Sequence, residues 1–104
     1  MRYSNNDYRY LRYLRDEVSK AKRDYINSLE LYILYQLHCA SLGITEESLL
    51  KEHYLEYEKI RRLYVDMLNC RDKLQHSYCS LVAFEDYLKE EYSKESNNGY
   101  VPQN

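Results

Sequence analysis

A heptad pattern of apolar residues and tyrosines runs through most of the chain. It can be written from residue 11 to residue 42 and again from residue 50 to residue 92, with these side chains three or four positions apart. Such spacing places one face of a helix against a neighbouring helix. In the second stretch the repeat stays near 3.5 residues, which predicts a left-handed supercoil. The pattern predicts an all-α chain with helices over about 6–42 and about 46–95.

The residues between these two stretches predict a sharp turn over 41–45. Gly43 is the only glycine in this part of the chain, and glycine commonly follows a helix end because it tolerates a positive φ. Thr45 is suited to cap the second helix. A full capping box would require Glu or Gln at the position of Ser48. The predicted architecture is a long antiparallel, coiled-coil-like helical hairpin.

The two predicted helices differ in length, and the difference bears on assembly. At 1.5 Å per residue, helices of about 36 and about 50 residues extend ~54 Å and ~75 Å. In a hairpin about Gly43, Leu11 would lie opposite residues 74–78, and nothing in the same chain would cover the apolar residues that follow. We expect a homodimer that forms a four-helix bundle, with a dimer interface at Tyr78, Val82, Phe84 and Leu88. The alternative is a three-helix bundle with a break near 75–77.

The hairpin is expected to form a single domain over residues 1–95, and the polar residues 96–104 predict a disordered tail. Residues 25–42 are apolar on several faces, which predicts contact with more than one neighbour. Polar residues interrupt this stretch, so no membrane span is predicted. The N-terminus lacks the apolar core of a signal peptide, and three widely spaced cysteines form no disulfide framework. A cytoplasmic location is expected.

Composition adds an unusual preference for tyrosine. The 104 residues include fourteen tyrosines, one phenylalanine and no tryptophan, while two glycines and one proline suit long helices. Tyrosine is suited to half-buried seams and interfaces, because its ring is apolar and its hydroxyl polar. The net charge of −2 selects no class of partner, but residues 1–23 carry seven basic and three acidic residues, and residues 24–58 one basic and seven acidic. Both charged regions are candidate contact surfaces.

Aromatic and cationic side chains alternate near the N-terminus. Arginine pairs with phosphate and tyrosine stacks on unpaired bases, so this pattern suits single-stranded nucleic acid or a nucleoprotein. The alternative is an ordinary solvated face on which arginine stems cover tyrosine rings. The candidate residues for contact with a partner or with nucleic acid are Tyr8, Arg9, Arg12, Tyr13 and Arg15, with Arg61 and Arg62 on the second helix.

A second candidate surface is acidic. Closely spaced carboxylates can imitate a phosphate backbone or dock on an arginine-rich groove. The alternative is that they complement the dipole at a helix N-terminus and keep the surface hydrated. The residues of this acidic contact surface are Glu46, Glu47, Glu52, Glu56 and Glu58.

Catalysis and metal binding find little support in the sequence. His76 and Cys79 have the spacing to share one ion, but the hairpin separates them from His38 and Cys39, so four ligands do not converge. No nucleophile has a base and an oxyanion donor at a suitable spacing. We expect no enzyme, no metal site and no cofactor.

The sequence favours a non-enzymatic protein-interaction module, a small inhibitor or adaptor that binds a larger protein or nucleoprotein. In its size and its lack of catalytic groups the chain resembles the small phage or mobile-element inhibitors of host defence, anti-CRISPR proteins among them. That likeness rests on no particular residue. Two alternatives are a helical protein that binds nucleic acid through the Tyr/Arg-rich end and a structural coiled-coil assembly subunit.

Overall fold

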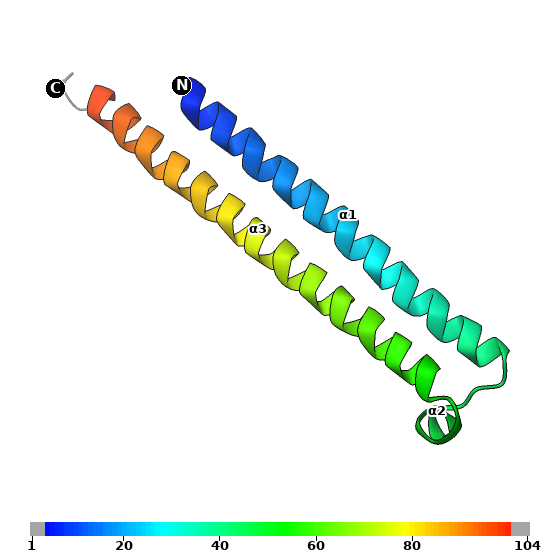
Figure 1. The fold of residues 1–104 in the computed structure, drawn as a ribbon. Helices are drawn as coiled ribbons and strands as arrows, with labels where there is room; N and C mark the ends of the chain where they lie inside the picture. Colours follow the sequence, from blue (N-terminus) through cyan, green and yellow to red (C-terminus); the bar gives the residue numbers. More distant parts are fainter. Residues whose placement is uncertain (1–3, 101–104) are drawn as a thin grey trace. The chain divides into compact units, whose positions relative to one another are not determined.

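The computed structural model describes residues 4–100, with side chains as far as residue 94. This part of the chain contains three helices and no strand: α1 (Asn5–Ser41), α2 (Glu46–Glu52) and α3 (Tyr54–Tyr100) (Figure 1). The prediction of an all-α helical hairpin is confirmed. The last helix continues to Tyr100 rather than ending near residue 95, and residues 101–104 of the predicted tail lie outside the described residues.

The turn after α1 forms as the sequence predicts. Gly43 has a φ of 78°. Its amide donates to the carbonyl of Ala40 at 3.0 Å, and the amide of Ile44 donates to the carbonyl of Cys39 at 3.1 Å. These two bonds make a Schellman motif, which satisfies carbonyl groups left free at the helix end and requires a left-handed residue at the glycine position.

The second predicted helix is interrupted, which corrects the expectation of one helix over about 46–95. Thr45 and Ser48 form a capping box at the start of α2, in which a serine hydroxyl takes the place of the expected Glu or Gln. The Thr45 amide donates to Ser48 Oγ at 3.0 Å, and the Ser48 amide donates to Thr45 Oγ1 at 3.1 Å. The helix ends after about two turns at His53, which has φ −130° and ψ 56°. From Tyr54 onward α3 is continuous, so the alternative break near 75–77 is absent.

The described residues divide into two compact units, each built from part of α1 and part of α3. The first, called the terminal unit, comprises residues 4–20 and 75–100 of the described chain. Its core consists of Leu11, Leu14, Leu81 and Leu88, with Val18, Phe84 and Tyr92 packed against them. Burial of each leucine stabilises the unit by roughly 1.5–3 kcal/mol.

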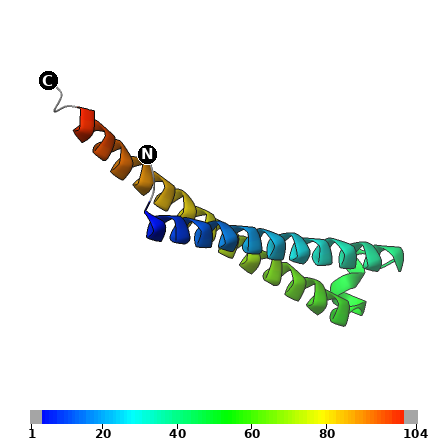
Figure 2. The ribbon, with the colours of Figure 1, turned by 90° about the horizontal axis from the view of Figure 1, so that it is seen from above.

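The packing of the terminal unit corrects the predicted pairing. Leu11 clusters with Leu81 and Leu88 rather than with residues 74–78. The end of α3 continues past the start of α1, as Figure 2 shows. Leu88, expected to lack cover within its own chain, is the most buried side chain of the described residues, with 1% of its surface exposed. The correction follows from α2, whose seven residues are not part of the helix that pairs with α1.

The second unit, called the turn unit, comprises Ala21–Leu74 and contains the turn and α2. Only Cys39 and Met67 are buried within it. Tyr32 contacts Tyr64, with ring centroids 5.4 Å apart. Among the described residues, no helix has an apolar stretch long enough to cross a membrane.

Candidate protein-interaction surface

In the turn unit, α1 places its tyrosines inward and its aliphatic side chains outward. Tyr25, Tyr32 and Tyr35 are half-buried, and Cys39 on the same side of the helix is 4% exposed. A second set of apolar residues, at positions i, i+7, i+8 and i+11, shares the other side of the helix. This set, called the aliphatic face of α1, consists of Ile26, Ile33, Leu34 and Leu37, which are 42%, 45%, 60% and 61% exposed.

The inward side shows why the tyrosines take these positions. Lys59 Nζ lies 4.6 Å from the centroid of the Tyr35 ring, a cation–π contact. Burial, followed by the charge of Cys39 and of Glu56, raises the pKa of the Tyr35 hydroxyl. Large aromatic rings bridge the space between α1 and α3 in the turn unit, so few aliphatic side chains are needed at this seam.

A shallow groove of about 250 Å³ follows the flank of the aliphatic face. It lies wholly within the turn unit and is lined by Leu31, Leu34, Tyr35, His38, Lys59 and Leu63. Leu31 is 57% exposed, so the apolar surface of α1 extends from the outward side of the helix into this groove. The combined surface has the form that accepts another elongated apolar element.

The two units differ sharply in what they expose. The large hydrophobic side chains exposed in the terminal unit, among the described residues, are all tyrosines: Tyr8, Tyr10, Tyr13, Tyr78 and Tyr87. Every Leu, Ile or Val that is exposed in the described part of the chain belongs to the turn unit, and Leu55 reaches 80% exposure. Single exposed aliphatic residues are ordinary, but a contiguous group marks an interaction site.

The predicted acidic residues belong to the turn unit as well. Glu46, Glu47 and Glu52 are exposed on α2, and Glu56 and Glu58 are half-buried on α3. A hydrogen bond from Tyr54 to Glu58, with the charge of that carboxylate, raises the pKa of the tyrosine. Glu30 lies on the aliphatic face of α1, four residues after Ile26 and four before Leu34. The structure therefore combines an acidic region with an aliphatic one.

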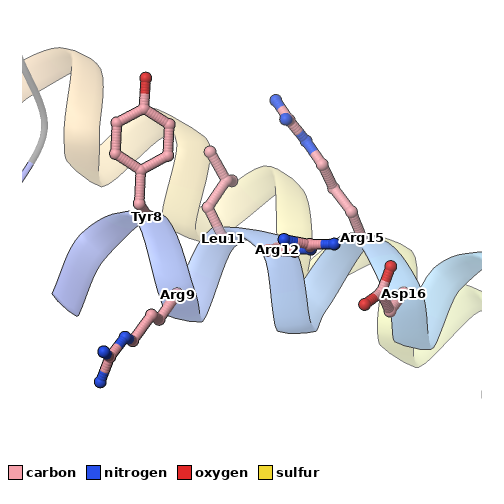
Figure 3. A pocket seen from close by; sticks show the side chains of 6 residues that line it. All are labelled: Tyr8, Arg9, Leu11, Arg12, Arg15 and Asp16. Atoms are coloured by element: carbon pink, nitrogen blue, oxygen red, sulfur yellow. The ribbon is translucent and has the colours of Figure 1, made fainter. Parts of the chain in front are cut away.

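Four residues of the predicted Tyr/Arg tract, Tyr8, Arg9, Arg12 and Arg15, line one groove of the terminal unit. Around this groove of about 460 Å³, Tyr8 and Arg15 project to one side of α1, and Arg9 projects to the opposite side (Figure 3). Arg15 Nη2 also lies 3.6 Å from Glu85 Oε2. A hydrogen bond to Glu17 and the charge of that carboxylate raise the pKa of Tyr13. Arg61 and Arg62 belong to the turn unit instead.

The residues predicted for a dimer interface occupy several environments in the terminal unit. Tyr78 is 58% exposed, Val82 and Phe84 are half-buried, and Leu88 is buried against its own chain. The Phe84 ring makes an edge-to-face contact with Tyr10 at 4.8 Å. Leu88 therefore needs no second copy to cover it, which corrects the expectation for this residue, while dimerisation itself stays a prediction.

Candidate metal ligands do not gather in the described part of the chain, where no group of three or more His, Cys, Asp or Glu side chains is placed to hold an ion. Cys39, Cys70 and Cys79 are free thiols. Cys39 is buried in the turn unit and Cys79 is exposed in the terminal unit, so each has a separate environment.

Comparison of the chain with protein-family models, with curated proteins and with solved structures finds no match. The aliphatic face of α1 is the main feature that the structure adds to the predictions made from the sequence. The sequence predicts that residues 25–42 contact more than one neighbour, but the interface expected from the unequal helix lengths was at residues 78–88. The signal was the second apolar stripe itself, since a helix packed on one neighbour needs only one.

Proposed function

We propose that this chain is a non-enzymatic interaction module that docks onto a larger protein through the aliphatic face of α1. The observation that carries the proposal is the inverted arrangement of α1 in the turn unit. There the half-buried side of the helix is rich in tyrosine, while Leu34 and Leu37 are about three-fifths exposed. Aliphatic side chains gain more from leaving water than tyrosines do, so this order favours a partner that covers the outward side.

The size of the face fits this role. Complete burial of an exposed Ile or Leu contributes roughly 1.5–3 kcal/mol, and covering these residues, which are 42–61% exposed, contributes about half of that each. Association costs about 4–15 kcal/mol in lost translational and rotational freedom. Four such residues, with Leu31 and the groove beside them, are comparable to the small group of side chains that supplies most of the binding energy in protein interfaces.

The specific form of the proposal is a small cytoplasmic inhibitor or adaptor. An inhibitor or adaptor of this kind needs a rigid binding surface and no catalytic group. The scaffold supplies a rigid surface because the aliphatic face belongs to one continuous helix, α1. The likeness in size to phage and mobile-element inhibitors favours the inhibitor form, in which the bound chain blocks a surface of its partner.

The experiment is site-specific photo-crosslinking in a lysate of the source cells. A photoreactive residue replaces Leu34 in one bait and Tyr78 in another, so that one probe lies on the aliphatic face and the other on the terminal unit. We expect the Leu34 bait to crosslink to one protein species that the Tyr78 bait does not capture. Excess untagged wild-type chain should compete for that species, whereas a Leu34→Glu, Leu37→Glu variant should not.

Three outcomes would contradict the proposal. The Leu34 bait could yield no defined adduct, the same adducts as the Tyr78 bait, or adducts only with another copy of the chain. A circular dichroism melting curve of each variant serves as a control for folding. Both replaced leucines are exposed, so the variants are expected to retain helix content and melting temperature.

A further inference from the structure

The aliphatic face of α1 lies within the most acidic part of the chain. Residues 24–58 include seven Asp or Glu residues and one basic residue, Lys51. The same stretch contains the aliphatic face, Leu31, Leu42, Leu50 and Leu55, all of them exposed. A partner that covers the face therefore meets the carboxylate of Glu30 within it.

We infer that the partner presents a basic amphipathic helix, with an apolar stripe for the aliphatic face and Lys or Arg beside that stripe. The inference rests on the proposed function and names the chemistry of its partner. Charge complementarity directs the choice, since Glu30 would otherwise be covered without a counter-charge. Covering an unpaired carboxylate is costly, whereas pairing it with a partner cation offsets that cost.

The form of the partner follows from the backbone. The described residues contain no strand, so the turn unit offers no sheet edge to which an extended peptide could add. Amide and carbonyl groups that become buried must be hydrogen-bonded. A helical partner pairs its amide and carbonyl groups internally. Its side chains at i, i+3, i+4 and i+7 match the spacing of the aliphatic face.

Other occupants fit less well. A second copy related by a two-fold axis would place the same acidic stretch, with Glu30, on both sides of one interface, and like charges across an interface are unfavourable. Nucleic acid and anionic lipid carry negative charge and would be repelled by the carboxylates. Lys59 is the one Lys or Arg among the residues that line the groove, and its ammonium group already contacts the Tyr35 ring.

The test uses the full chain and three labelled synthetic peptides of more than about 15 residues, long enough to form helices. The basic probe has leucines in a heptad stripe flanked by Lys and Arg. The acidic probe has Glu at the flanking positions, and the scrambled probe has the basic composition without the stripe. Fluorescence anisotropy should show the basic probe binding at least about tenfold more tightly than either of the others.

Two variants make the test specific to the face. Leu34→Glu with Leu37→Glu should weaken the basic probe at least about tenfold, and Glu30→Lys should reduce the preference for the basic probe over the acidic one. Tyr78→Glu, on the terminal unit, is the matched control and should leave the affinity unchanged. Binding should also weaken between about 0.1 M and about 1 M salt, where exposed charges are screened.

Equal binding of the basic and acidic probes would overturn the inference, as would equal binding of the basic and scrambled probes or no binding of any probe. So would sedimentation showing wild-type dimers that Leu34→Glu dissociates, because a second copy would then be the occupant. These results are distinct from failure of the proposed function. A heterologous crosslink at Leu34 combined with equal probe binding retains the docking surface and removes only the basic helix.

Discussion

The hydroxyl of Tyr92 joins α3 to the start of α1, donating a hydrogen bond of 2.9 Å to Oδ2 of Asp7. The same hydroxyl accepts a hydrogen bond of 2.9 Å from the backbone amide of Ser4. Ser4 Oγ in turn accepts from the amide of Asp7 at 3.1 Å, so that one tyrosine completes the N-terminal cap of α1 from another helix. This contact fixes which residues of α3 lie beside the first turn of α1.

Removing the hydroxyl tests that contact. We expect Tyr92→Phe to lower the free energy of unfolding by about 0.5–1.5 kcal/mol, because the ring stays in place while the hydrogen bond to Asp7 is lost. Urea denaturation followed by circular dichroism measures the change. Tyr78→Phe is the matched control, since Tyr78 is exposed, and an equal loss in both variants would contradict the assignment.

The core of the terminal unit gives the largest expected effect. Leu88 is 1% exposed and Leu34 is 60% exposed. The same substitution at the two positions therefore distinguishes the loss of core packing from the mere loss of a leucine. Leu88→Ala should destabilise the chain by about 2–5 kcal/mol through lost burial and the cavity that remains. Leu34→Ala should change stability by no more than about 0.5 kcal/mol. Thermal melts that rank the two variants in the opposite order would show that the described core is wrong.

The turn at Gly43 is expected to be sensitive to backbone conformation alone. Its φ of +78° is unfavourable for residues with a Cβ, yet no atom lies within 4 Å of the place a Cβ would occupy. Gly43→Ala should therefore cost about 1–2 kcal/mol from the left-handed conformation and nothing from a clash. Gly43→Asn should cost less, because asparagine tolerates this conformation better. Chemical denaturation of both variants checks the order, and equal costs would point to another cause.

Alkaline pH should weaken the turn unit through Tyr35. Burial raises the pKa of this hydroxyl above its ordinary value of 10.0, with the charges of Cys39 and Glu56 contributing further. The folded state therefore favours neutral tyrosine. The resulting stability is fully present below the unfolded pKa and is lost as pH rises through the folded one. Denaturation at a series of alkaline pH values should show a smaller loss for Tyr35→Phe than for wild type, and identical losses would contradict this role.

The sequence was sufficient for the fold class and for the turn, because both depend on local signals. The heptad pattern specifies helices, and Gly43 with Thr45 specifies where one ends and the next begins. The capping box at Ser48 was missed because a serine hydroxyl can do what the usual Glu or Gln does. These are features that a residue and its near neighbours determine.

The pairing of the helices could not be obtained in the same way. His53 continues the heptad pattern, and no glycine or proline marks the end of α2, so the interruption leaves no local signal. With α2 assigned to the long helix, Leu11 was expected opposite residues 74–78, whereas it packs with Leu81 and Leu88. Because the pairing was wrong, the interface was expected at residues 78–88 rather than at the aliphatic face of α1.

The most direct test of the account is methyl NMR of the full chain, labelled at Ile and Leu, during titration with the basic probe. The account predicts that the methyl resonances of Ile26, Ile33, Leu34 and Leu37 shift and saturate together, while those of Leu81 and Leu88 stay unchanged. Shifts confined to the terminal unit, or no shifts at a probe concentration that saturates the anisotropy signal, would contradict the claim that the aliphatic face of α1 is the docking surface.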